Sequence, residues 1–116
     1  MDKLELNISK LKDNIKKQQL KIQSIKYKMD NETNDYIFET LSKSFEISKT
    51  ELSKLKKDLD NEVDTLKKEK NIYKKSLAKV KESLNDLYKV SKNDFKIKRY
   101  IQEMNNTIIN IEKYLS

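Results

Sequence analysis

The sequence predicts an all-α protein, an antiparallel coiled coil or helical bundle of three long helices. Apolar residues recur at alternating spacings of three and four along most of the 116 residues, which is typical of helices that bury one face. The chain has no Gly and no Pro, the residues that most often interrupt a helix. Charged residues make up 39%, a share found in many disordered chains, but the apolar residues fall in register, so periodicity outweighs composition.

The first helix is expected over residues 2–29. Asp2 fits the N-cap position, and Glu5 completes a capping box with it. The apolar row that follows is a heptad seam, the set of a and d positions through which coiled helices meet. Gln18 is its one polar member, which either selects register and oligomeric state or lies at a solvent-facing edge. The central members of this seam are Ile8, Leu11, Ile15, Gln18, Ile22 and Ile25.

Six polar residues, 30–35, separate this helix from the next and favour a short turn. Either Asn34 or Asp35 is expected to cap the second helix. Residues 1–34 carry eight lysines against five acids, a net +3, and residues 35–65 carry five lysines against eight acids, a net −3. Antiparallel pairing of these two segments sets opposite charges side by side, which favours a hairpin.

The central helix is expected over residues 35–90. Its seam contains two successive spacings of four, at Leu55, Leu59 and Val63, where a left-handed supercoil relaxes. Alternatively, polar residues near 58–62 mark a loop that converts the protein into a four-helix bundle. We favour the continuous helix because the seam continues through this region without Gly or Pro. The seam residues singled out here are Leu52, Leu55, Leu59, Leu66, Leu77, Val80, Leu84 and Leu87.

The third helix is expected over residues 92–115. Ser91 and Asp94 form a capping-box pattern, and the seam loses its phase at the same point. Val90 and Phe95 are placed to form a hydrophobic staple across this start. The seam then resumes in phase, so the helix is expected to fold back along the second half of the central helix. Its seam residues are Ile101, Met104, Ile108 and Ile111.

Residue types exclude most catalytic chemistry. The chain has no His, no Cys and no Gly, so the usual metal sites, thiol nucleophiles, histidine bases and glycine-rich phosphate loops are absent. Carboxylate pairs at helical spacing, such as Asp58 with Glu62, are interpreted as a solvated acidic face in preference to a cation site. We therefore expect no enzymatic activity, no catalytic residue, no metal, no cofactor and no small-molecule ligand.

A lysine-rich segment is the clearest candidate for contact with an anionic partner. Residues 66–93 hold nine lysines against three acids, a net +6, and the lysines are expected to spread around the helix. They either keep a coiled coil in solution, bind phosphates without sequence preference, or meet an acidic protein surface. A single arginine, Arg99, argues against base-specific readout. The candidate contact residues are Lys67, Lys68, Lys70, Lys74, Lys75, Lys79, Lys81, Lys96, Lys98 and Arg99.

The preferred functional hypothesis is a non-enzymatic coiled-coil protein–protein interaction module. Residues 1–116 are expected to form one domain that self-associates, as a dimer or higher oligomer, or binds a larger protein. Abundant Lys, Asn and Ile indicate an AT-rich genome, which fits a small accessory protein of a phage or mobile element, such as an inhibitor of a host nucleoprotein complex. The alternative is non-specific nucleic-acid binding through residues 66–99. Short apolar runs predict a cytoplasmic protein without a membrane-spanning helix. A helix that binds a membrane surface is a weaker alternative, because its lysines are expected to spread around the helix and not to oppose a broad apolar face.

Overall fold

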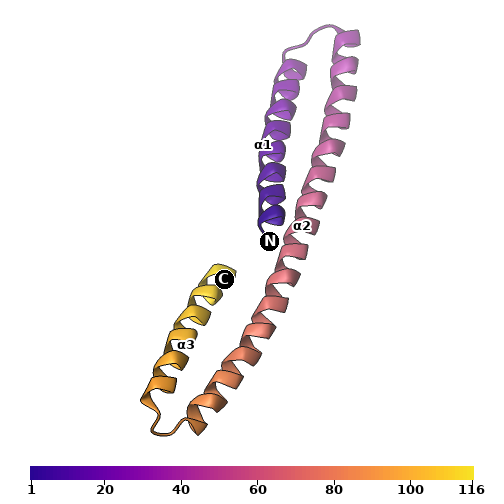
Figure 1. Cartoon of the computed structure of the whole chain (residues 1–116). Coiled ribbons are helices and arrows are strands. Elements are labelled where there is room, and N and C mark those ends of the chain that lie inside the picture. The colour runs from indigo at the N-terminus through magenta and orange to yellow at the C-terminus, as the bar shows by residue number, and fades with distance from the viewer. The chain divides into compact units, whose positions relative to one another are not determined.

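A computed structural model describes all 116 residues and contains three α-helices and no strand. Helix α1 spans Asp2–Asp30, α2 spans Asp35–Val90 and α3 spans Phe95–Leu115 (Figure 1). The all-α class is thereby confirmed. Helix α2 runs without interruption through residues 58–62, so the four-helix alternative is not adopted.

The three helices form two hairpins that share α2. The contacts divide the chain into two units, Met1–Leu66 and Lys67–Ser116, here called the first and second hairpin. In the first hairpin, α1 lies antiparallel to the initial part of α2, and in the second, α3 lies antiparallel to its final part (Figure 1). The single domain expected over residues 1–116 stays a prediction.

The seam of the first hairpin is covered over most of its length, and Phe38, near the turn, is the exception at 43% exposed. Ile8, Ile15 and Ile25 of α1 are buried, with 8–9% of their surface exposed. The other predicted seam residues of this hairpin are half-buried, namely Leu11, Gln18, Ile22, Leu52, Leu55, Leu59 and Leu66. Two helices are therefore sufficient to shield most of the a and d rows of this unit from water.

Gln18 forms a polar contact across the first hairpin. Its Nε2 donates to the backbone carbonyl oxygen of Ser48 at 3.0 Å and to Oε2 of Glu51 at 3.1 Å. Ser48 is only 2% exposed, because its small side chain occupies the seam position between Phe45 and Leu52. A long polar side chain thus faces a short one, and the two hydrogen bonds favour this register over one in which Gln18 faces an apolar residue.

The connection between α1 and α2 follows the sequence expectation. The side-chain Oδ1 of Asn34 accepts hydrogen bonds from the backbone N–H groups of Tyr36, at 3.0 Å, and Ile37, at 3.2 Å. These N–H groups have no partner within the helix, so Asn34 acts as the N-cap. At the start of α1 the expectation was wrong: the N-cap is Met1, without a side-chain hydrogen bond, because Asp2 already belongs to the first turn.

The connection between α2 and α3 corrects the predicted start at residue 92. The backbone N–H of Ser91 donates to the carbonyl of Leu87 at 3.0 Å, so Ser91 extends the last turn of α2 and does not cap α3. Lys92 then adopts a left-handed conformation, with φ of 41°. Asp94 is the actual cap, because its Oδ1 accepts from the N–H of Ile97 at 3.1 Å. The predicted staple also fails, because Phe95 is 80% exposed.

Two substitutions of Gln18 distinguish the contribution of its hydrogen bonds to stability from the contribution of its packing in the seam. We expect Gln18→Ala to lower the free energy of unfolding by about 1–2 kcal/mol, because it removes two hydrogen bonds and leaves a gap. Gln18→Leu should be at least as stable as the natural chain, because an apolar side chain of similar volume fills the same position. Urea unfolding followed by circular dichroism measures both, with the exposed Gln19→Ala as control. A larger loss for Gln18→Leu than for Gln18→Ala would contradict this account.

Candidate functional site

The second hairpin has a narrow core built from one row of each helix. Leu84 of α2 packs with Ile101 and Ile108 of α3, and the partly buried Leu77 joins this cluster. Leu115, one heptad beyond Ile108, is 3% exposed. The buried residues of each helix therefore lie seven positions apart, which means that only one of the two seam rows of each helix lies in the contact.

The second seam row of each helix is exposed. Its members are between 39% and 52% exposed, whereas Ile101 in the contact is 2% exposed. Val80, Leu87, Met104 and Ile111, all predicted seam residues, therefore lack within this chain the cover that their counterparts in the first hairpin have. We call this surface the open face, which consists of Tyr73, Val80 and Leu87 of α2 and Ile97, Met104 and Ile111 of α3.

An ion pair between Lys81 and Glu112 marks one side of the contact between α2 and α3. Successive residues of a helix are rotated by about 100° around its axis. On α2, Lys81 therefore lies to one side of the buried Leu84, and Val80 lies to the other side. The exposed row of α2 is thus on the side of the contact that faces away from the ion pair.

The same geometry holds on α3. Glu112 lies to one side of the buried Ile108, and Ile111 lies to the other side. Because Glu112 reaches Lys81 on the first side, the exposed rows of both helices share the second side. The open face is therefore one continuous apolar surface that crosses both helices of the second hairpin.

The lysines of α2 are segregated from the open face. At about 100° per residue, all lysines from residue 67 to residue 89 fall within roughly half of the helix circumference. The expectation that they spread around the helix was therefore wrong. The other half carries the open face, the core row and Glu69 as its one charged residue. We call the lysine-bearing side the lysine half; it also carries Glu82 and Asp86, and its lysines are Lys67, Lys68, Lys70, Lys74, Lys75, Lys79, Lys81 and Lys89.

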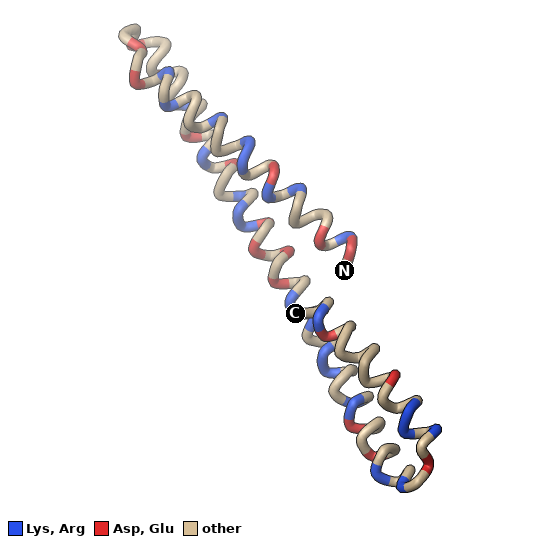
Figure 2. Tube along the Cα trace, turned by 90° about the vertical axis from the view of Figure 1, so that its left-hand side faces the viewer, with Lys and Arg blue, Asp and Glu red and all other residues tan.

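Several of the predicted phosphate-contacting residues are engaged within the chain. Lys81 pairs with Glu112, Arg99 pairs with Glu103 at 3.7 Å, and Nζ of Lys98 lies 5.1 Å from the centre of the Tyr88 ring. Lys70 is half-buried. Exposed side chains without an ion pair remain at Lys67, Lys68, Lys74, Lys75, Lys79 and Lys96. Figure 2 shows the blue Lys and Arg positions recurring along this part of α2.

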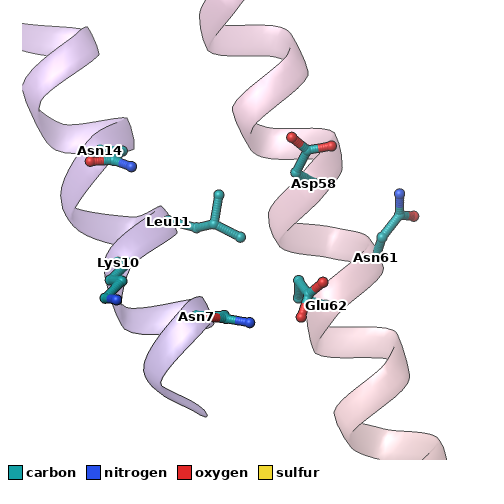
Figure 3. A pocket seen from close by; sticks show the side chains of 7 residues that line it. All are labelled: Asn7, Lys10, Leu11, Asn14, Asp58, Asn61 and Glu62. Atoms are coloured by element: carbon teal, nitrogen blue, oxygen red, sulfur yellow. The ribbon is translucent and has the colours of Figure 1, made fainter. Parts of the chain in front are cut away.

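A groove in the first hairpin gathers polar residues from both helices. Figure 3 shows Asn7 and Leu11 of α1 pointing toward α2, where Asp58 and Glu62 lie. The Oε2 atom of Glu62 is buried without a hydrogen-bond partner. The structure has no group of three or more His, Cys, Asp or Glu side chains that is suited to hold a metal ion.

Three features were missed from the sequence alone. Ser48 is a core residue, and its position three after Phe45 and four before Leu52 was an available signal. The segregation of lysine from the open face was also present in the sequence as a rotational pattern. The exposure of the second seam row had no sequence signal, because Val80 and Leu84 are spaced as if both were buried.

Comparisons with known protein families, with curated proteins and with solved structures found no match to this chain. None of the three helices combines the length and the apolar character that crossing a membrane requires. The function proposed below is therefore based on the side chains of this chain alone.

Proposed function

We propose that this protein is a non-enzymatic coiled-coil interaction module that presents the open face of its second hairpin to another protein helix, in a second copy or in a larger partner. One observation supports this: the seam residues of the first hairpin between Ile8 and Ile25 and between Leu52 and Leu66 are buried or half-buried, whereas Val80, Leu87, Met104 and Ile111 are 40–52% exposed. Contiguous apolar surface in contact with water is unfavourable by about 25 cal/mol per Å², so a covering helix stabilises the protein.

Residue usage supports a narrower form of the same proposal. Only Arg99 is an arginine among 26 basic residues, a bias that fits an AT-rich genome. A chain of this size and composition fits a cytoplasmic accessory or regulatory protein of a phage or mobile element. Inhibition of a host nucleoprotein complex is one role in which helix faces alone are sufficient.

Met104→Lys tests the use of the open face. The natural chain is expected to show a mass above 13.9 kDa by light scattering, or to retain a protein partner in a pull-down. A charge at a half-exposed position of the apolar surface should weaken either association by roughly tenfold or more. Asn106→Lys, an exposed change on the same helix, is the control. A monomer that retains no partner contradicts the proposal.

A second candidate function is non-specific binding of a nucleic acid through the lysine half of α2. The observation that favours it is the grouping of Lys67, Lys68, Lys74, Lys75 and Lys79 as exposed, unpaired charges on one side of a helix. Such an array displaces counterions from a phosphate backbone, so the affinity falls steeply with salt concentration. Tyr88 is not available for base stacking on its Lys98-covered side.

The triple substitution Lys74→Glu, Lys75→Glu and Lys79→Glu tests this second function. Lys81 is left unchanged, because Glu at that position would repel Glu112 and disturb the hairpin. If the lysine half binds DNA or RNA, a gel shift at about 50 mM salt should disappear. The control has the same change in net charge on the first hairpin, at Lys54, Lys56 and Lys57. Equal shifts for both triple variants, or no shift for the natural chain, exclude this function.

A further inference from the structure

We infer that the open face docks a second copy of this chain, so that two copies of the second hairpin form a four-helix bundle. This inference rests on the proposed function and names the partner. In such a bundle the second seam row of each helix, exposed in the single hairpin, becomes the contact between the two copies. Every seam residue of the second hairpin then has the cover that the first hairpin achieves with two helices.

The shape of the surface supports a second copy. Next to the open face, the outer row of α2 is small in its middle, at Ser76 and Ser83, between Glu69 and Val90. The outer row of α3 carries Tyr100 and Tyr114, which are 50% and 57% exposed, with Thr107 between them. A two-fold axis parallel to the helices places the outer row of α2 in one copy against the outer row of α3 in the other, on both sides of the contact. In this arrangement the space beside the serines of one copy accommodates tyrosine of the other.

The exposed area is large enough for a dimer. The six open-face residues and the two outer tyrosines are each roughly half exposed, between 39% and 57%. With full side-chain areas of about 150–250 Å² for the large residues, they offer on the order of 700 Å² per copy. A stable interface of standard size buries about 800 Å² on each partner, so this face alone nearly meets that requirement.

Charge also agrees with a second copy as the occupant. The open face carries no lysine of α2, and its edges carry only Glu69, Lys96 and Glu103. In a face-to-face dimer the two lysine halves point outward, separated by two layers of helix, or roughly 20 Å. This separation exceeds the screening length of about 8 Å at physiological salt, so their repulsion is small. An acidic partner would instead be drawn to the lysine half, away from this face.

A matched pair of substitutions on α3 tests the inference. Ile111 and Ile109 are 40% and 46% exposed, but Ile111 belongs to the open face, and Ile109 lines the groove beside Lys81 on the other side. Sedimentation equilibrium of the full chain should show a dimer at about 100 µM. Ile111→Lys should weaken dimerisation by roughly 100-fold, because the two-fold axis introduces the charge twice, whereas Ile109→Lys should leave it within about threefold.

Ser83→Lys keeps the test valid if Ile111→Lys unfolds the hairpin. Ser83 is exposed, and lysine has the higher helix propensity, so helicity should be maintained while dimerisation weakens by at least roughly tenfold. A natural chain that is monomeric at about 100 µM, or equal effects of Ile111→Lys and Ile109→Lys, overturns the inference. A pull-down with the same variants then separates two failures. If the natural chain retains a protein partner that Ile111→Lys loses and Ile109→Lys keeps, the proposed function stands although the dimer inference fails. If the natural chain retains no partner, the proposed function and the dimer inference both fail.

Discussion

A helix can bury its seam only if enough neighbouring helices are present, and this requirement governs the structure of both hairpins. Each helix offers two rows of apolar residues, and a single antiparallel neighbour must fit between them to cover both. In the first hairpin α1 does so, because Ile8 and Ile15 are buried and Leu11 and Ile22 are half-buried. In the second hairpin α3 packs on one row only, with Ile101 buried and Met104 half exposed. The two units therefore differ in how many seam rows the neighbouring helix covers. The proposed self-association covers the row that stays exposed in the second hairpin.

Polar residues distinguish the two hairpins as well. The first has Gln18 within its seam, and this side chain is satisfied by the carbonyl of Ser48 and the carboxylate of Glu51 in the same chain. The contact favours one pairing of α1 with α2 and supplies a reason for this unit to close on itself. The second hairpin has no polar group in its core cluster of Leu84, Ile101 and Ile108. An ion pair across its helices, Lys81 with Glu112, lies beside the core, on the side away from the open face.

Much of the fold was predictable from the sequence, because the spacing of apolar residues and the absence of Gly and Pro determine where the helices run. Helices α1 and α2 begin and end within about a residue of the expected positions, at Asp2–Asp30 and Asp35–Val90. The start of α3 was not predictable in this way, because Ser91 and Asp94 both match a cap, and only the hydrogen bonds distinguish them. The open face was not predictable either, because spacing shows which residues favour burial but does not show how many neighbours will cover them. The lysine grouping, by contrast, follows from rotation about the helix axis alone.

Amide hydrogen exchange measured at several protein concentrations tests the central claim most directly, because it reports the cover of each hairpin separately within one intact chain. The account predicts that protection of the first hairpin, including residues 35–66 of α2, does not change with concentration. Protection of residues 67–90 and of α3 should rise as the chain becomes more concentrated, because a second copy then covers Val80, Leu87, Met104 and Ile111. Protection that is independent of concentration in both hairpins would contradict the account.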